Sequence, residues 1–67
     1  MKKYLLIIES DDGQVMVAYD SARVTFSKWR DVIRDGYRAE VYARQSVDGK
    51  EESYVRTFPD WRYTDEN

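Results

Sequence analysis

Two pairs of adjacent acidic residues are the first candidates for chemistry in this sequence. Asp11 and Asp12 stand just before one glycine, and Glu51 and Glu52 follow shortly after another. Paired carboxylates can divide the roles of acid and base where their environments separate their pKa values. Here the first pair falls in a predicted turn and the second on an exposed strand, where carboxylates stay solvated. We therefore expect no active site at either pair.

Other reactive combinations are missing from the composition. The chain has no cysteine and no histidine, which excludes disulfides, thiolate or imidazole metal sites and the usual pairs of nucleophile and base. The acidic residues near the C-terminus, Asp60, Asp65 and Glu66, lack the spacing of a calcium loop. The glycines fall in separate turns and cannot form a phosphate-binding loop. We expect no enzyme, no cofactor and no metal.

Length and charge narrow the class of protein further. A chain of 67 residues forms one domain and buries only about 60% of the surface that its unfolded form exposes, so self-association would add stability. A hydrophobic share of 42% fits a folded domain rather than a disordered segment. The net charge of -2 gives no overall field toward nucleic acid or an acidic membrane.

The apolar run at residues 4–8 follows two lysines but ends at Glu9. It is shorter than the core of a signal peptide, and no other run approaches a membrane span, so we expect a cytoplasmic protein. Because a strand points alternate residues to opposite faces, an unbroken apolar run requires cover on both sides. We therefore place residues 4–8 in the central strand of a sheet.

Two similar segments, 10–14 and 46–50, predict β-hairpins. Both read S-x-D-G-[QK], and an Asp-Gly step between apolar or alternating runs is a strong hairpin signal. We expect three-residue loops that pair Ser10 with Gln14 and Ser46 with Lys50. In the first hairpin this register sets Leu6 opposite Ala18; the sequence leaves open which face of that hairpin lies under the helix.

In the second hairpin the same register is favoured by its cross-strand pairs, each of which would contribute roughly 0.2 to 1 kcal/mol. On one face, opposite charges meet at both ends and two tyrosines meet between them: Arg44 with Glu52, Tyr42 with Tyr54, and Glu40 with Arg56.

Between the hairpins, an apolar stripe predicts an amphipathic helix. Ala22, Phe26, Trp29 and Ile33 recur at spacings of four, three and four residues, and Gly36 stands where a helix commonly ends. The first turn could be capped by Asp20, Ser21 or Thr25. The predicted water-facing side carries Arg23, Arg30 and Arg34.

The predicted architecture is α+β: one ββαββ domain over residues 1–58, with a four-stranded, mostly antiparallel sheet and one helix packed on one face. A right-handed crossover allows the strand orders 2-1-4-3 and 2-1-3-4. We favour the first, which resembles the β-grasp arrangement in element order only. Residues 59–67 form a C-terminal tail that contains aromatic residues.

A single helix leaves the second face of the sheet uncovered. An exposed apolar and aromatic area of this kind usually marks an interaction site. The tail either folds back over that face as a lid or joins a contact surface. Because aromatic anchors dominate interfaces, the candidate partner-binding residues are Tyr42, Tyr54, Trp61 and Tyr63, flanked by Arg38.

We therefore expect a small, non-enzymatic protein-interaction module that forms a homodimer and binds no membrane. Small chains of this build are often adaptors or inhibitors, including phage-encoded, viral proteins that act on a host protein. The alternative is binding of single-stranded nucleic acid on a Tyr/Arg sheet face. Against it, the predicted register pairs Arg44 and Arg56 with glutamates, which leaves no basic excess for phosphates.

Overall fold

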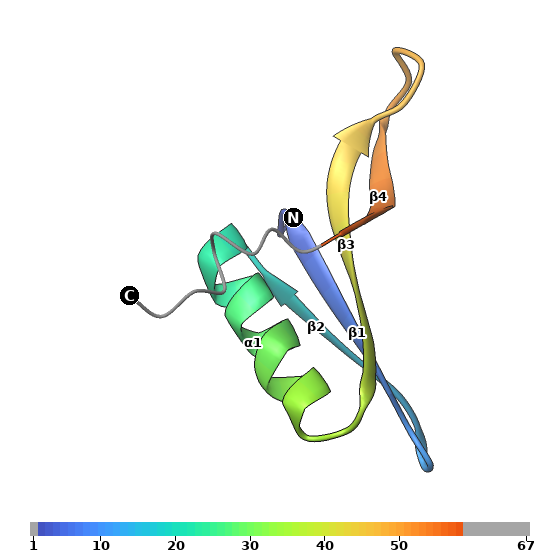
Figure 1. Ribbon diagram of the computed structural model, residues 1–67. Coiled ribbons are helices and arrows are strands. Elements are labelled where there is room, and N and C mark those ends of the chain that lie inside the picture. Colours follow the sequence, from blue (N-terminus) through green and yellow to red (C-terminus); the bar gives the residue numbers. More distant parts are fainter. Residues whose placement is uncertain (1, 59–67) are drawn as a thin grey trace.

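The chain forms two β-hairpins separated by one helix (Figure 1). The structure is a computed structural model and describes residues 2–58. Its elements are β1 (Tyr4–Ser10), β2 (Gly13–Tyr19), α1 (Ala22–Arg34), β3 (Arg38–Ser46) and β4 (Glu52–Thr57). The predicted α+β fold with ββαββ order is thereby confirmed. Within residues 2–58, no helix has the length and apolar character needed to cross a membrane.

The strands form one antiparallel sheet in the order β2-β1-β3-β4. The favoured order 2-1-4-3 is wrong, and the alternative 2-1-3-4 is confirmed. The two strand orders differ in which strand, β3 or β4, lies buried beside β1 under the helix. On the face under the helix, β3 presents Ala39, Val41 and Ala43, small side chains that fit beneath α1 over most of its length. β4 is shorter than β3, and short strands suit an edge position.

As expected, β1 is central, but the first hairpin differs from the prediction by one residue. Ser10 pairs with Gly13, so the turn contains two residues rather than three, and Leu6 lies opposite Val17. Because side chains alternate, this shift exchanges the two faces of β2 relative to β1, so that Val17 rather than Ala18 lies on the same face as Leu6. The observed register also aligns polar residues: Gln14 lies opposite Glu9, and its Nε2 donates to Glu9 Oε1 at 3.4 Å.

The second hairpin differs from the prediction by two residues. Ser46 pairs with Glu52, and residues 47–51 form the connection. Within it, the N–H of Lys50 donates to the carbonyl of Val47 at 3.0 Å, and Asp48 and Gly49 both have positive φ, as a type I′ turn requires. The tight turn is thus followed by one extra residue before β4. A shift of two preserves the predicted faces of β3 and β4 while it changes the direct partners.

Helix α1 begins and ends at sequence signals that were predicted. Ser21 is the N-cap, and its hydroxyl accepts from the N–H of Val24 at 3.2 Å. At the other end Gly36 has a φ of 91° and its N–H donates to Ile33, while the N–H of Tyr37 donates to Val32. This is a Schellman motif, which satisfies the last carbonyl groups of the helix. One predicted detail is wrong: the Arg30 side chain is only 12% exposed and does not lie on the water-facing side.

The core lies between α1 and the two central strands. Leu6, Phe26 and Val41 are almost completely buried, and the ring of Tyr4 packs edge-on against Phe26 at a centroid distance of 5.9 Å. The indole Nε1 of Trp29 donates to the carbonyl of Ala39 at 3.1 Å. The helix is thereby fixed above β1 and β3 by both apolar contact and a directional bond.

The adjacent residues Leu5 and Leu6 test which face of β1 lies under the helix. We expect Leu6→Ala to lower the free energy of unfolding by about 2 to 5 kcal/mol, because it leaves a cavity in the core. Leu5→Ala, on the opposite face of the same strand, should cost roughly 1 kcal/mol. Urea denaturation of both variants measures the difference. Equal losses, or a larger loss at Leu5, would contradict the observed facing of β1.

Candidate protein-interaction face

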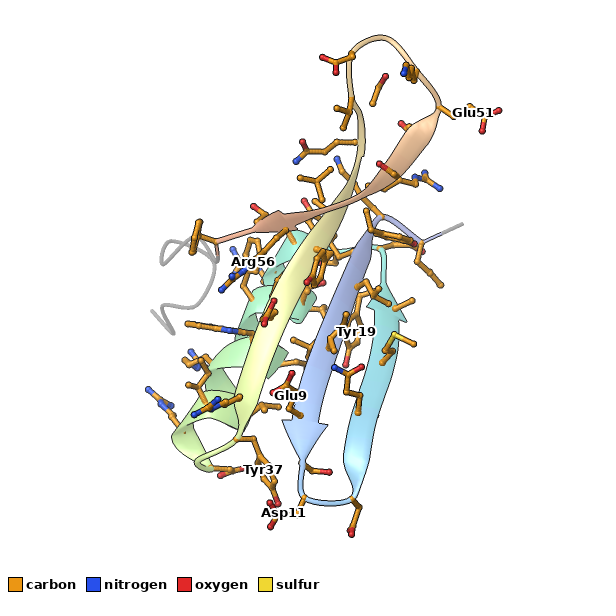
Figure 2. The ribbon with its side chains drawn as sticks, turned by 90° about the vertical axis from the view of Figure 1, so that its right-hand side faces the viewer. Glu9, Asp11, Tyr19, Tyr37, Glu51 and Arg56 are labelled. Atoms are coloured by element: carbon orange, nitrogen blue, oxygen red, sulfur yellow. The ribbon has the colours of Figure 1, made fainter. Side chains whose placement is uncertain are left out.

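The face of the sheet opposite α1 carries a continuous apolar area that no described element covers. We call it the open-face patch, and it faces the viewer in Figure 2. In one row across the sheet, Ala18, Leu5 and Tyr42 are cross-strand neighbours, and in the next row Met16 lies opposite Ile7. Met16 is 63% exposed, and the other members are half-buried or exposed. The patch is therefore formed by Leu5, Ile7, Met16, Ala18 and Tyr42.

Charged residues of both signs surround the patch. Arg56 Nε lies 3.5 Å from Glu40 Oε2, and at the β3–β4 hairpin Arg44 Nε lies 2.8 Å from Glu52 Oε2. Toward the first hairpin, Arg38 is the direct cross-strand partner of Glu9. The predicted ion pairs are present, but both join diagonal rather than directly opposite residues. The surface therefore combines an apolar centre with a rim of nearly balanced charge.

Tyr42 connects the patch to this rim. It extends from β3 between Leu5 on β1 and Arg56 on β4, and its hydroxyl donates to Glu40 Oε2 at 3.0 Å. This hydrogen bond to a carboxylate stabilises the protonated phenol and raises the pKa of Tyr42 above its usual value of 10.0; desolvation of the phenol acts in the same direction. The side chain is thus held in one orientation, with its ring on the open face.

The other predicted site residues have different positions. Tyr54 lies opposite Arg44 rather than Tyr42, so the predicted tyrosine pair is wrong. The hydroxyl of Tyr54 instead donates to the carbonyl of Lys2 at 2.6 Å. Arg38 is exposed on the open face, opposite Glu9, and its predicted role beside a partner stays a prediction. Trp61 and Tyr63, with the rest of the tail, lie outside the described residues.

Sequence reasoning missed the part of the patch that β1 and β2 contribute. The three-residue loop put Ala18 opposite Leu6, so Leu5 and Ile7 were grouped with the valines of β2 instead of with Met16. The sequence does contain a signal for the observed register of the first hairpin. Pairing Glu9 with Gln14 keeps polar residues on one face, whereas the predicted register would have set Glu9 opposite an apolar valine.

The polar side chains around the patch do not form a metal-binding cluster in the described part of the chain. No group of three or more acidic side chains that could hold a metal ion occurs among residues 2–58, which contain neither histidine nor cysteine. A depression of about 540 Å³ borders the patch between Ile7 and Tyr37, and its lining is a mixture of apolar residues, arginines and glutamates. Such a mixed lining is chemically suited to contact with another molecule.

Comparisons with protein-family models, with curated proteins and with solved structures found no match to this chain. The function of the chain is therefore inferred from the geometry and chemistry of this face.

The bond between Tyr42 and Glu40 can be tested by titration. We expect the phenol of Tyr42 to ionise at higher pH than a free tyrosine, and Glu40→Gln to bring its pKa closer to the ordinary value. Because the folded-state pKa is raised, this contribution to stability is present below the unfolded pKa, near 10, and is lost as pH rises through the folded pKa. Tyrosine ring resonances followed by NMR from neutral to alkaline pH measure the shift. An unchanged pKa in Glu40→Gln would contradict the assigned cause.

Proposed function

We propose that the chain is a small, non-enzymatic protein-interaction module, an adaptor or inhibitor, that self-associates and binds a protein partner through the open-face patch. One observation carries the proposal: Leu5, Ile7, Met16, Ala18 and Tyr42 form a continuous apolar surface on a sheet face that no described element covers. Large exposed apolar patches rimmed by polar residues are typical of interaction sites.

The chemistry of the rim favours protein over nucleic acid as the partner. Arg44 and Arg56 each lie within ion-pair distance of a glutamate, and the chain as a whole carries a small negative charge. Phosphate binding requires an excess of positive charge. A protein surface with an apolar centre and charges of both signs fits this arrangement better, because paired rim charges give specificity without a strong net field.

The form of the patch also suits a protein contact. Tyr42 is an aromatic side chain with little remaining freedom, since its hydroxyl is held by Glu40, and it loses little entropy on binding. Met16 is flexible and polarisable, and such side chains adapt to the shape of a partner. Together they provide one fixed anchor and one adaptable contact.

Photo-crosslinking tests this proposal. A photoreactive amino acid at Ile7, within the patch, should give a discrete adduct with another protein in the cells that naturally carry the chain. The same group at Lys28, on the exposed side of α1, is the matched control and should give none. Met16→Glu, which places a charge in the patch without removing a core side chain, should abolish the adduct. Identical products from both positions would contradict a binding role for this face.

Single-stranded oligonucleotides provide the comparison with the alternative function. We expect no binding at moderate salt. Tight binding that falls steeply with added salt and is lost in Tyr42→Ala would replace the protein-partner proposal with the nucleic-acid one.

A further inference from the structure

Of the two edges of the sheet, the outer edge of β2 carries fewer protective features than that of β4. β2 ends the sheet on one side, and in the part of the chain that the structure describes no segment pairs with its outer side (Figure 2). Its sequence, GQVMVAY, contains no charged residue and no proline, and Val15 and Met16 are 52% and 63% exposed on its two faces. Proteins usually protect such strands with charges, prolines or bulges, because an open apolar edge pairs readily with another strand.

The hydrogen-bond alternation of the sheet shows which backbone groups of β2 point outward. The N–H of Arg44 donates to the carbonyl of Lys3, so the odd residues of β1 bond to β3. The even residues of β1, Leu6 among them, therefore bond to β2, and their partners there are Gly13, Val15, Val17 and Tyr19. The remaining N–H and C=O groups face away from the sheet: those of Gln14, Met16 and Ala18.

We propose that two copies of this chain pair antiparallel through β2, about a twofold axis at Met16, to form one continuous eight-stranded sheet. The inference rests on the proposed self-association and gives it a geometry. The outward groups are placed symmetrically about Met16. Met16 then pairs with Met16 of the second copy, and Gln14 of each copy pairs with Ala18 of the other, which makes six new backbone hydrogen bonds in the ladder.

The register follows from symmetry and charge. A twofold axis requires each residue to meet one on the same face, so that the helices of both copies lie on the same side of the joint sheet. Centring on Met16 overlaps the whole seven-residue strand. Centring on Val15 would bring Asp12 into the paired segment, and centring on Val17 would bring in Asp20. With Met16 at the centre these carboxylates stay at the ends, where Lys2 Nζ lies 3.1 Å from Asp20.

A second copy fits this edge better than a different strand does, because pairing through β2 leaves neither copy with an open β2 edge. After two copies join through β2, both outer edges of the new sheet are β4, whose outward-facing residues include Glu52 and Arg56. Charged residues at an edge oppose further pairing. The assembly therefore stops at a dimer, and the Met16 side chains of the two open-face patches meet at the axis.

Solution mass and hydrogen exchange test the pairing. Light scattering over a wide range of concentration should show a monomer–dimer equilibrium. In amide exchange followed by NMR, the N–H groups of Gln14, Met16 and Ala18 should exchange fast in dilute samples and become protected as the dimer forms. A chain that stays monomeric throughout would overturn the proposal. So would a dimer in which these amides exchange as fast as in the monomer, or open-ended growth beyond two copies.

A proline substitution separates the backbone bond from the side chain. Met16→Pro removes an outward N–H that makes no bond within the sheet, so the fold tolerates it. It should weaken the dimer at least tenfold, by roughly the loss of two backbone hydrogen bonds. Met16→Ala is the matched control: it keeps the N–H and should weaken the dimer less. Equal dimer affinities for the two variants would overturn the pairing, and if Met16→Pro does not fold, the exchange measurement on the unaltered chain decides.

The dimer measurements and the crosslinking test give results that distinguish failure of the β2 pairing from failure of the open-face patch. A dimer with protected β2 amides but no adduct at Ile7 would retain the pairing and reject the open-face patch as a binding surface. A monomer that still forms the adduct would reject the pairing and retain the patch.

Discussion

The central constraint of this fold is that β1 is apolar on both faces while residues 2–58 provide only one helix to cover it. The helix covers Leu6, which lies between Val17 and Val41 and belongs to the same buried cluster as Phe26. Leu5 and Ile7 point the other way, and within residues 2–58 they have only their strand neighbours for cover. Strand order follows from this constraint, because β3 presents the small apolar side chains that allow the helix to approach closely. An exposed apolar face on the other side is the direct consequence.

Helix α1 covers the strands of the sheet unevenly even on the face against which it packs. α1 is fixed toward β3 by the bond from Trp29 to Ala39, and Val15, near the hairpin end of β2, is more than half exposed. The two edges of the sheet are also unlike each other. Where β4 ends at Thr57, Trp29 satisfies the next outward carbonyl of β3, whereas no described residue does the same for β2. Near its hairpin end β2 is thus exposed on both faces, at Val15 and Met16, and no described segment pairs with its outer edge.

The sequence predicted the elements, their order along the chain, the helix caps and the faces of β3 and β4, because each depends on local chemistry. It did not determine the registers. Arg44 reaches Glu52 across a diagonal, so long charged side chains make nearly the same pairs when the strands slip by two residues. In the first hairpin, both faces of β1 are apolar, so hydrophobic alternation could not choose between them. Strand order was equally open, because both candidates satisfy the handedness rule and only burial along β3 separates them.

What the patch contributes to folding bears on its role. Leu5 and Ile7 are partly buried between neighbouring strands, so apolar side chains there support the sheet. Met16 is different, since at 63% exposure its side chain removes little apolar surface from water in the single chain. A polar residue would serve the isolated fold as well and would protect the edge. The methionine therefore adds little to the stability of one copy, while at the middle of β2 it lies where the open-face patch and the unpaired backbone edge meet. The proposed contact with a second chain would give it a physical function that the single copy lacks.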